Sequence, residues 1–368
     1  MSSAQVVLLT GILVACASAL PGCFLLLRKM AMMSDAISHA VLPGLVAGYF
    51  LARGPNLLAG FAGAALAATV TVALVEAAQS TRRVAGGAAI GIVFPAMFAL
   101  GTVLVSKFFA NVHLDTDAIL YGNIEFAPFD TLVVGGRDLG PQSLWVMGGL
   151  CLLNLAFVAL FYKELKLATF DPGLAAALGF SPVLIHYALM GVLSVTAVGA
   201  FTAVGAILVV ALMIIPAATA YLLTDRLPVM IALAVLIGGL TAVLGYGAAT
   251  LLDASIAGTM ATAAGALFAL ALLGAPTQGL LARARQLRRQ RDRFAVEMLV
   301  VHLLNHEGTA GQAAESAVAH LGDELRWDAT FRDSAVGRAT REQLVARQGD
   351  HLALTAAGRG LAARVIAR

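Results

Sequence analysis

The chain has 368 residues, of which 60% are hydrophobic and only 12% are charged. Soluble domains are about 45–50% apolar and about 25% charged, so this composition requires a lipid bilayer as part of the solvent. The three cysteines all lie in apolar runs, which excludes a secreted disulfide scaffold. Apolar segments recur as far as about residue 274, so an N-terminal signal peptide cannot account for the hydrophobicity.

Charge divides the chain into two parts. Residues 1–280 hold 10 Lys and Arg against 11 Asp and Glu, whereas residues 281–368 hold 14 Arg against 10 Asp and Glu. We therefore expect a membrane domain over 1–280, a basic linker over 281–293 and a small cytoplasmic domain over 294–368. The linker contains the run RARQLRRQRDR, which is typical of a solvated helix attracted to anionic membrane lipid.

A helix needs roughly 20 apolar residues to cross the hydrocarbon core of a membrane. The segments that reach this length lie near 5–27, 30–52, 57–78, 85–106, 143–162, 183–200, 201–223, 228–250 and 254–274. The stretch 183–223 is long for one span and short for two, so the pattern predicts eight or nine spans. The fold class is therefore an all-α polytopic membrane protein with a small C-terminal α+β domain.

Lysine and arginine in the short loops set the expected orientation, because cytoplasmic loops carry an excess of both. Arg82, Arg83, Lys163, Lys166 and Arg226 can all face the cytoplasm in the nine-span arrangement. The C-terminus is then expected on the cytoplasmic side.

The second span contains an acid and an imidazole at helical spacing. Asp35 and His39 are four residues apart and so point from one face of a helix. An aspartate within a span costs about 2.5–3.5 kcal/mol on insertion scales, so a compensating role is expected. One carboxylate and one imidazole suit a divalent cation such as Mn, Fe or Zn. Pro43 lacks the N–H that would bond the carbonyl of His39, which leaves a further oxygen free.

The spacing also fits a purely structural interpretation of the same pair. Asp35 and His39 could bond to each other or to a neighbouring helix and hold the bundle together. Two ligands are too few for a metal site, but a symmetric dimer would bring two carboxylates and two imidazoles to its axis.

The segment SDAISHAVLPG (34–44) is similar to the second-helix signature of the permease subunit of ATP-binding cassette importers for manganese, iron and zinc. The resemblance continues in the family's order through AAIGIVFPAMFALG (88–101), LYGNI (120–124), FDPGLAAALGF (170–180) and AVGAILVVALMIIPAATAYLLT (203–224). It implies that Asp35 and His39 lie on the metal translocation path. Segment 38–44 looks closer to the manganese and iron members, which favours Mn(II), with Zn(II) or Fe(II) as alternatives.

The resemblance also implies a set of partners and a location. Such a permease works as a homodimer or heterodimer in the bacterial plasma (inner) membrane, in contact with lipid. Two cytoplasmic ATPase subunits bind it, and an extracytoplasmic binding protein delivers the metal. The chain has no GxxxxGK[ST] phosphate loop, so it is expected not to be an enzyme, and ATP hydrolysis is expected on a separate subunit. No cofactor is expected besides the transported metal.

Two rival functions differ in testable ways. A permease for chelated iron or cobalamin would have a wide path without metal ligands. An ATP-independent secondary transporter usually shows an internal repeat, and no convincing repeat is visible in this sequence.

The segment 170–182 resembles the cytoplasmic loop through which these permeases contact their ATPase. Asp171, Ala175, Ala176 and Gly179 match its pattern of a short helix that fits closely into a cleft and ends at a glycine. The chain departs from the family at Gly173, where members commonly have an acidic residue, and at the pair 86–87, where polar or acidic residues are common. These departures leave the details of ATPase contact open.

The tail resembles a winged-helix domain over 294–368. Its ending, LALTAAGRGLAARVIAR (352–368), is similar to the wing and last helix of manganese- and iron-dependent repressors of the diphtheria toxin repressor type. The expected recognition segment, 328–343, mixes acidic residues with arginines, which makes a poor phosphate-binding face. A protein-contact or regulatory role is therefore expected, and a nucleic-acid partner is not. His302, His306 and His320 could bind metal, although their spacing alone does not establish a site.

Overall fold

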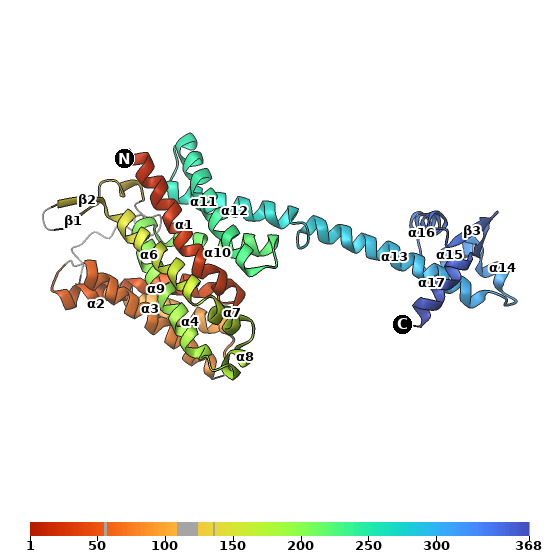
Figure 1. Ribbon diagram of the computed structural model, residues 1–368, viewed down its shortest axis with the longest axis horizontal. Helices are drawn as coiled ribbons and strands as arrows, with labels where there is room; N and C mark the ends of the chain where they lie inside the picture. Colours follow the sequence, from red (N-terminus) through yellow and green to blue (C-terminus); the bar gives the residue numbers. More distant parts are fainter. Residues whose placement is uncertain (55–56, 82, 109–123, 135–136, 368) are drawn as a thin grey trace. The chain divides into compact units, whose positions relative to one another are not determined.

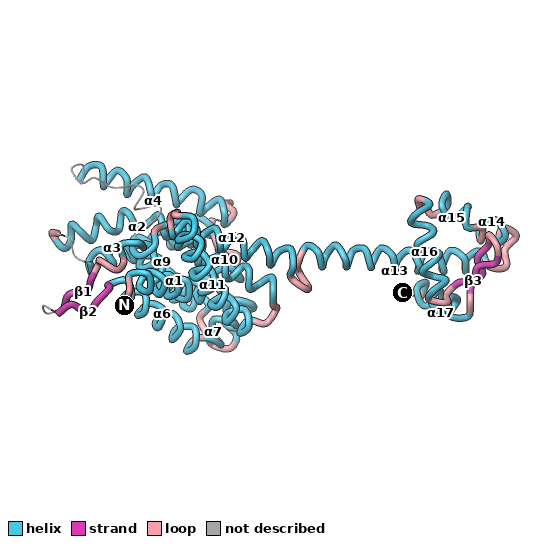
Figure 2. The backbone as a smooth tube through the Cα atoms, turned by 90° about the horizontal axis from the view of Figure 1, so that it is seen from above, coloured by secondary structure: helices cyan, strands magenta, loops and turns pink. Residues whose placement is uncertain are grey.

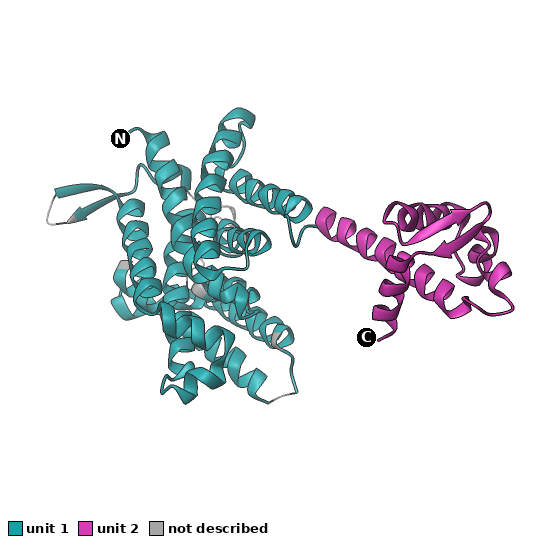
Figure 3. Ribbon diagram, turned by 45° about the vertical axis from the view of Figure 1, so that its right-hand side comes forward, with its two compact units in different colours: residues 1–279 teal, residues 280–368 magenta. Residues whose placement is uncertain are grey.

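The computed structural model describes residues 1–54, 57–81, 83–108, 124–134 and 137–367. They form two compact units, Met1–Gly279 and Leu280–Arg368 (Figure 3). The first unit is a helical bundle, and the second combines helices with a two-stranded sheet.

Within the described residues, the first unit has nine helices that are long and apolar enough to cross a membrane. They are α1 (Ser3–Leu27), α2 (Met32–Ala52), α3 (Leu57–Ser80), α4 (Gly86–Phe108), α6 (Gln142–Leu160), α9 (Pro182–Val204), α10 (Ala206–Leu223), α11 (Leu227–Leu252) and α12 (Ile256–Gly274). Helix α1 is the most buried and packs against α6, α9, α10 and α11, while α2, α3 and α4 lie side by side (Figures 1 and 2). The expected polytopic membrane fold is confirmed.

A glycine resolves whether the stretch 183–223 holds one span or two. Helix α9 ends and α10 begins at Gly205, whose φ of +79° and ψ of 169° are disfavoured for residues with a side chain. Its N–H still donates to the carbonyl of Phe201 at 3.0 Å. The chain therefore breaks into two helices, and the break falls a few residues later than the sequence pattern predicted.

A short hairpin follows α4, where only a loop was expected. Strand β1 (Thr131–Val134) pairs antiparallel with β2 (Arg137–Pro141), after a 3₁₀ turn at Ile124–Phe126. The Trp145 indole N–H donates to the carbonyl of Leu139 at 2.9 Å and so ties β2 to α6. The all-helical prediction for the membrane domain is wrong at this hairpin, because the strand TLVV is too short to give an alternating pattern.

Small residues allow α2 and α3 to approach closely. A side chain at Gly44 would collide with the backbone of Gly63, and one at Gly48 would lie 2.9 Å from the Cα of Gly60. Gly44 and Gly48 form a GxxxG pattern, which permits close contact between membrane helices. This contact helps to fix the helix that carries Asp35 and His39.

We expect Gly44→Leu to destabilise the bundle, because the leucine would have to push α2 away from α3. Overpacking of this kind typically costs about 1–3 kcal/mol of folding free energy. Thermal unfolding of the purified protein in detergent measures the loss. Gly239→Leu on α11 is the matched control, since a side chain there meets no atom within 4 Å. Equal stability of the two variants would contradict the role of the α2–α3 contact.

The second unit is built on one long helix. The structure gives α13 (Leu280–His306), α14 (Gln312–Glu315), α15 (Val318–Glu324), α16 (Ala329–Arg341), β3 (Val345–Gln348), β4 (His351–Leu354) and α17 (Ala356–Ile366). Strands β3 and β4 are antiparallel, with Val345 opposite Leu354, and an isolated bridge joins Ala317 to His351. The expected basic linker 281–293 is the first half of α13 and not a separate segment.

A compact apolar core holds the second unit together. Leu299, Leu321 and Ala339 are fully buried between α13, α15 and α16. Thr355 caps α17 by accepting a hydrogen bond from the N–H of Gly358 at 3.1 Å. Arg359 of α17 donates to the Glu307 carboxylate and so holds the pKa of Glu307 below its usual range. This ion pair connects the last helix to the end of α13.

Candidate functional site

The pair singled out in the second span lies near the start of α2. The Nε2 atom of His39 is 3.5 Å from Oδ1 of Asp35, within ion-pair distance. The side chain of His39 is 24% exposed and that of Asp35 is 42% exposed in this single copy of the chain. The two groups therefore contact each other and are still accessible to an ion.

Helix α4 covers one side of the pair. The His39 ring lies 4.9 Å from the ring of Phe94 and 5.5 Å from that of Phe98, measured between centroids. A side chain at Gly101 would lie 2.7 Å from Cδ of Pro43, so this glycine lets α4 pack directly on the proline of α2. The motifs 34–44 and 88–101, separate in sequence, thus build one site.

Two serines next to the pair are buried in α2. Ser38 donates from its hydroxyl to the carbonyl of Ser34 at 2.9 Å. The Ser34 hydroxyl is buried and makes no hydrogen bond to another described residue. A buried hydroxyl without a partner is costly, so Ser34 offers a further oxygen close to the pair.

The chemistry of this site is limited by its ligand count. Among the described residues of the first unit, no third His, Cys, Asp or Glu lies close enough to share an ion with Asp35 and His39. One carboxylate and one imidazole are ligands that suit a divalent transition metal ion. Complete coordination needs backbone oxygens, water or a second copy of the chain.

The segment that resembles a coupling loop forms the short helix α8 (Pro172–Ala177), after α7 (Tyr162–Phe170). Asp171 caps it by accepting from the N–H of Leu174 at 2.9 Å. Gly179 ends it with a φ of +87°: its N–H donates to the carbonyl of Ala176, and the next N–H donates to the carbonyl of Ala175, both at 3.0 Å. This pair of backbone hydrogen bonds is the Schellman motif, which requires a residue in the left-handed conformation.

The two alanines of α8 have different environments. Ala175 is fully buried within its own unit, whereas Ala176 and Gly179 are exposed. The methyl group of Ala175 packs α8 onto its own unit, so Ala176 and Gly179 are the small residues of this segment that face outward. The surface around α8 is apolar, with Leu174, Leu178, Phe170, Phe180, Val183 and Leu184 all exposed. Exposed apolar clusters of this kind mark contact sites for protein or for membrane lipid.

Two polar networks between helices, one buried and one partly buried, were missed by sequence reasoning. Asn154 of α6 donates to the carbonyl of Ala17 at 2.7 Å and to the hydroxyl of Thr196 at 2.8 Å, and so joins three helices. Interhelical hydrogen bonds of this type stabilise membrane bundles. Asn154 within the otherwise apolar run 144–160 was the only signal in the sequence.

The second network lies beside the α7–α8 segment. Arg28, at the end of α1, bonds Thr169 at 3.1 Å and Nδ1 of His186 at 3.2 Å, and His186 pairs with Glu76 of α3. His186 is thus engaged in ion pairing and packing, as expected for a structural histidine. The network joins α1, α3, α7 and α9.

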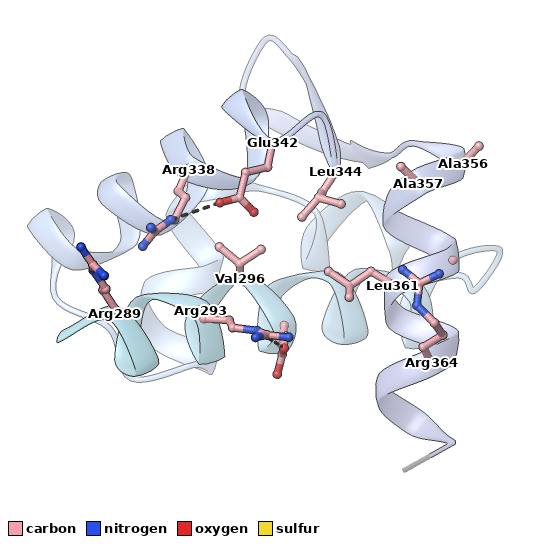
Figure 4. Close-up of a pocket in the computed structure, with 12 residues that line it drawn as sticks. Arg289, Arg293, Val296, Arg338, Glu342, Leu344, Ala356, Ala357, Leu361 and Arg364 are labelled. Carbon is pink, nitrogen blue, oxygen red and sulfur yellow. Dashed lines mark hydrogen bonds and ion pairs between the residues drawn. The ribbon is translucent and has the colours of Figure 1, made fainter. Parts of the chain in front are cut away.

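A cavity of about 710 Å³ lies in the second unit between α13, α16 and α17. Arg289, Arg293, Arg338 and Arg364 surround its apolar residues (Figure 4). Acidic neighbours offset part of this charge, since Arg293 pairs with Glu297 at 3.0 Å and Arg338 with Glu342 at 3.2 Å.

The bundle and its intramembrane acid–imidazole pair define a multi-pass membrane protein with a polar site inside one span. The model of the ABC 3 transport family matches residues 2–275. The chain therefore belongs to the ABC 3 transport family. The segment LYGNI (120–124), quoted above for its similarity to metal permeases, lies mostly outside the residues that the structure describes.

Named relatives include transport proteins for two metals. The chain is 47% identical to the zinc transport system membrane protein TroD of Treponema pallidum, over 97% of both chains. It is 45% identical to the manganese transport system membrane protein MntD of Bacillus subtilis, over 78% of this chain and 97% of that one. The solved structure of PsaBC from Streptococcus pneumoniae in complex with Fab matches with a TM-score of 0.63 and 32% identity, covering 76% of this chain and 94% of that chain.

Proposed function

We propose that this chain is the membrane permease of an ATP-driven importer for divalent transition metal ions, with Mn(II) as the principal substrate. The observation that carries the proposal is the Asp35–His39 pair inside α2, in a chain of the ABC 3 transport family. Several relatives are named as manganese transport proteins. The protein is then a transport subunit and not an enzyme.

The proposed function implies partners on both sides of the membrane. ATP hydrolysis belongs to a separate subunit, and the exposed apolar surface around α8 is the surface we assign to it. An extracytoplasmic binding protein delivers the metal. A second copy or a paralogue completes the coordination, since Asp35 and His39 are the only His, Cys, Asp or Glu ligands that the described residues of one copy bring to this site.

The proposed location is the bacterial inner membrane with the C-terminus in the cytoplasm. Lys163, Lys166 and Arg226 support this orientation, because lysine and arginine concentrate in cytoplasmic loops. It places α8 and the second unit on the side where ATP is available.

Reconstitution tests the proposal directly. Vesicles that contain this chain, its ATPase and its binding protein should accumulate radioactive Mn(II) only when ATP is present on the ATPase side. Vesicles that enclose ADP in place of ATP, and vesicles without binding protein in the outer solution, are the controls. Uptake at the same rate without nucleotide would identify a secondary transporter and end the assignment.

Zn(II) is the alternative substrate, because the relative that matches 97% of this chain is named as a zinc transport protein. Competition in the same vesicles separates the two metals. An excess of unlabelled Zn(II) that suppresses Mn(II) uptake more strongly than unlabelled Mn(II) does would favour zinc. ATP-dependent uptake of neither free ion would favour a chelated substrate.

We infer a winged-helix-like fold and a regulatory, protein-contact role for the second unit. The order of the four helices α13 to α16, the β3–β4 hairpin and the final helix α17 supports the fold. The arginines of α16 support the role: Arg338 pairs with Asp292 at 3.0 Å, and Arg332 pairs with Asp333 at 2.9 Å. Arginines engaged in this way are less available to phosphates, so nucleic acid is not the proposed partner.

A further inference from the structure

Metal-ligating side chains meet in the second unit at the end of α13. His302 and His306 lie one helical turn apart, with ring centroids 4.8 Å from each other. Glu315, the last residue of α14, joins them, and the ligand atoms of these three residues all lie within 4.8 Å of one another. His320 of α15 adds a nitrogen, Nε2, at 3.2 Å from Oε2 of Glu315.

The burial of His302 distinguishes this cluster from a surface group of charges. His302 is only 8% exposed, and its Nε2 lies 3.5 Å from Oε2 of Glu315. That oxygen is itself buried and receives no hydrogen bond of suitable geometry from a described residue. A buried carboxylate oxygen without a donor is costly, and a bound cation would remove the cost.

A local hydrogen-bond network explains only part of the arrangement. Nε2 of His302 lies 3.2 Å from the backbone oxygen of Glu315, a contact that would anchor α14 to α13. The ion pair between His320 and Glu315 would anchor α15 in the same way. Neither contact accounts for His306 beside His302, and the approach of His320 to Oε2 of Glu315 lacks the geometry of a hydrogen bond.

We propose that His302, His306 and Glu315 form a binding site for a divalent transition metal ion, with His320 as the fourth ligand. Three imidazole nitrogens and one carboxylate oxygen suit tetrahedral Zn(II). Zinc bonds of about 2.0–2.2 Å place ligand atoms roughly 3.3 Å apart, so binding requires the side chains to draw together by rotation. The site does not depend on the transport function proposed above.

The position of the site gives metal binding a structural consequence. The ion would join α13 to α14 and α15, directly before the residues that pair with the hairpin. There the carbonyl of Ser316 accepts from the N–H of Leu352, and the N–H of Val318 donates to the carbonyl of Asp350, both at 2.9 Å. Metal occupancy therefore stiffens the connection between α13 and β4, which makes this unit responsive to free metal.

Metal binding to the full-length protein in detergent tests the site. The double variant Asp35→Asn, His39→Ala serves as background, so that the membrane pair does not contribute. We expect this background to bind one equivalent of Zn(II) in equilibrium dialysis, and Co(II) to give the visible absorption bands of a tetrahedral complex. Adding Glu315→Gln or His306→Ala should weaken Zn(II) binding at least about 100-fold, because each removes a ligand.

His351→Ala is the matched control, since it removes an exposed imidazole that contacts Ser316 at 3.2 Å but lies outside the cluster. It should bind Zn(II) like the background. Glu315→Gln preserves side-chain size, and circular dichroism confirms that each variant is folded. The proposal is overturned if the background binds no Zn(II), or if the cluster variants bind as tightly as His351→Ala.

Discussion

Asp35→Asn is expected to stop metal transport while the protein stays folded in the membrane. The substitution removes the anionic ligand of the pair but keeps the size of the side chain. Hydrogen-bond partners of metal ligands are worth about 10–100-fold in affinity or activity, so loss of a ligand should lower uptake by at least about 100-fold. Removing a costly intramembrane charge need not destabilise the bundle. Radioactive Mn(II) uptake into reconstituted vesicles measures the effect.

The same variant separates a metal path from a mutual structural pair. Asparagine can still bond the imidazole of His39, which lies 3.5 Å from Asp35, so a purely structural pair should tolerate it. His39→Ala should also abolish transport if the imidazole is a ligand. Asp225→Asn is the matched control, because Asp225 lies in a loop and only accepts a hydrogen bond from Gln278 at 2.8 Å. Normal uptake by Asp35→Asn would favour the structural pair.

Gly179→Trp is expected to uncouple the permease from its ATPase. Gly179 is exposed at the end of α8, beside the apolar surface proposed for docking, where an indole ring would obstruct a close contact. Its φ of +87° also disfavours any residue with a side chain. The variant should still bind metal, since Asp35 and His39 lie on another helix, but metal should no longer stimulate ATP hydrolysis. ATPase assays on the reconstituted complex and co-purification provide the measurement.

Gly179→Asn distinguishes obstruction from backbone strain. Asparagine tolerates the left-handed conformation better than other residues, so this variant should retain most of the coupling. If Gly179→Asn and Gly179→Trp are both fully coupled, α8 is not the docking element. A cysteine introduced by Leu174→Cys reports the side of the membrane: labelling by an impermeant thiol reagent added outside intact cells would place α8 on the wrong side for an ATPase.

The membrane architecture could be predicted because it depends on length and composition. Each span must bury about 20 residues in hydrocarbon and satisfy its own backbone, and a run of apolar residues records that requirement directly. The ambiguity at 183–223 arose because an unbroken apolar run shows no boundary. Gly205 ends α9 through its backbone conformation, which hydropathy does not encode.

The acid–imidazole pair was predictable from spacing, whereas its surroundings were not. Four residues on a helix place Asp35 and His39 on one face whatever the rest of the chain does. The contacts with Phe94 and Phe98 depend on α4 packing against α2. That packing is possible because Gly101 has no side chain to collide with Pro43. In the same way, only the packing of α8 shows that Ala175 is buried and Ala176 is exposed.

Sequence alone therefore determined the class of the protein, its spans, its family resemblance and the two residues proposed for the metal path. These features are local: they depend on composition, helical period and short motifs. Only the tertiary structure brought Glu315 and His320 to His302 and His306, and joined Arg28 to His186 and Glu76. Those groups come from different helices, and which helix faces meet is decided by side-chain packing across the whole unit.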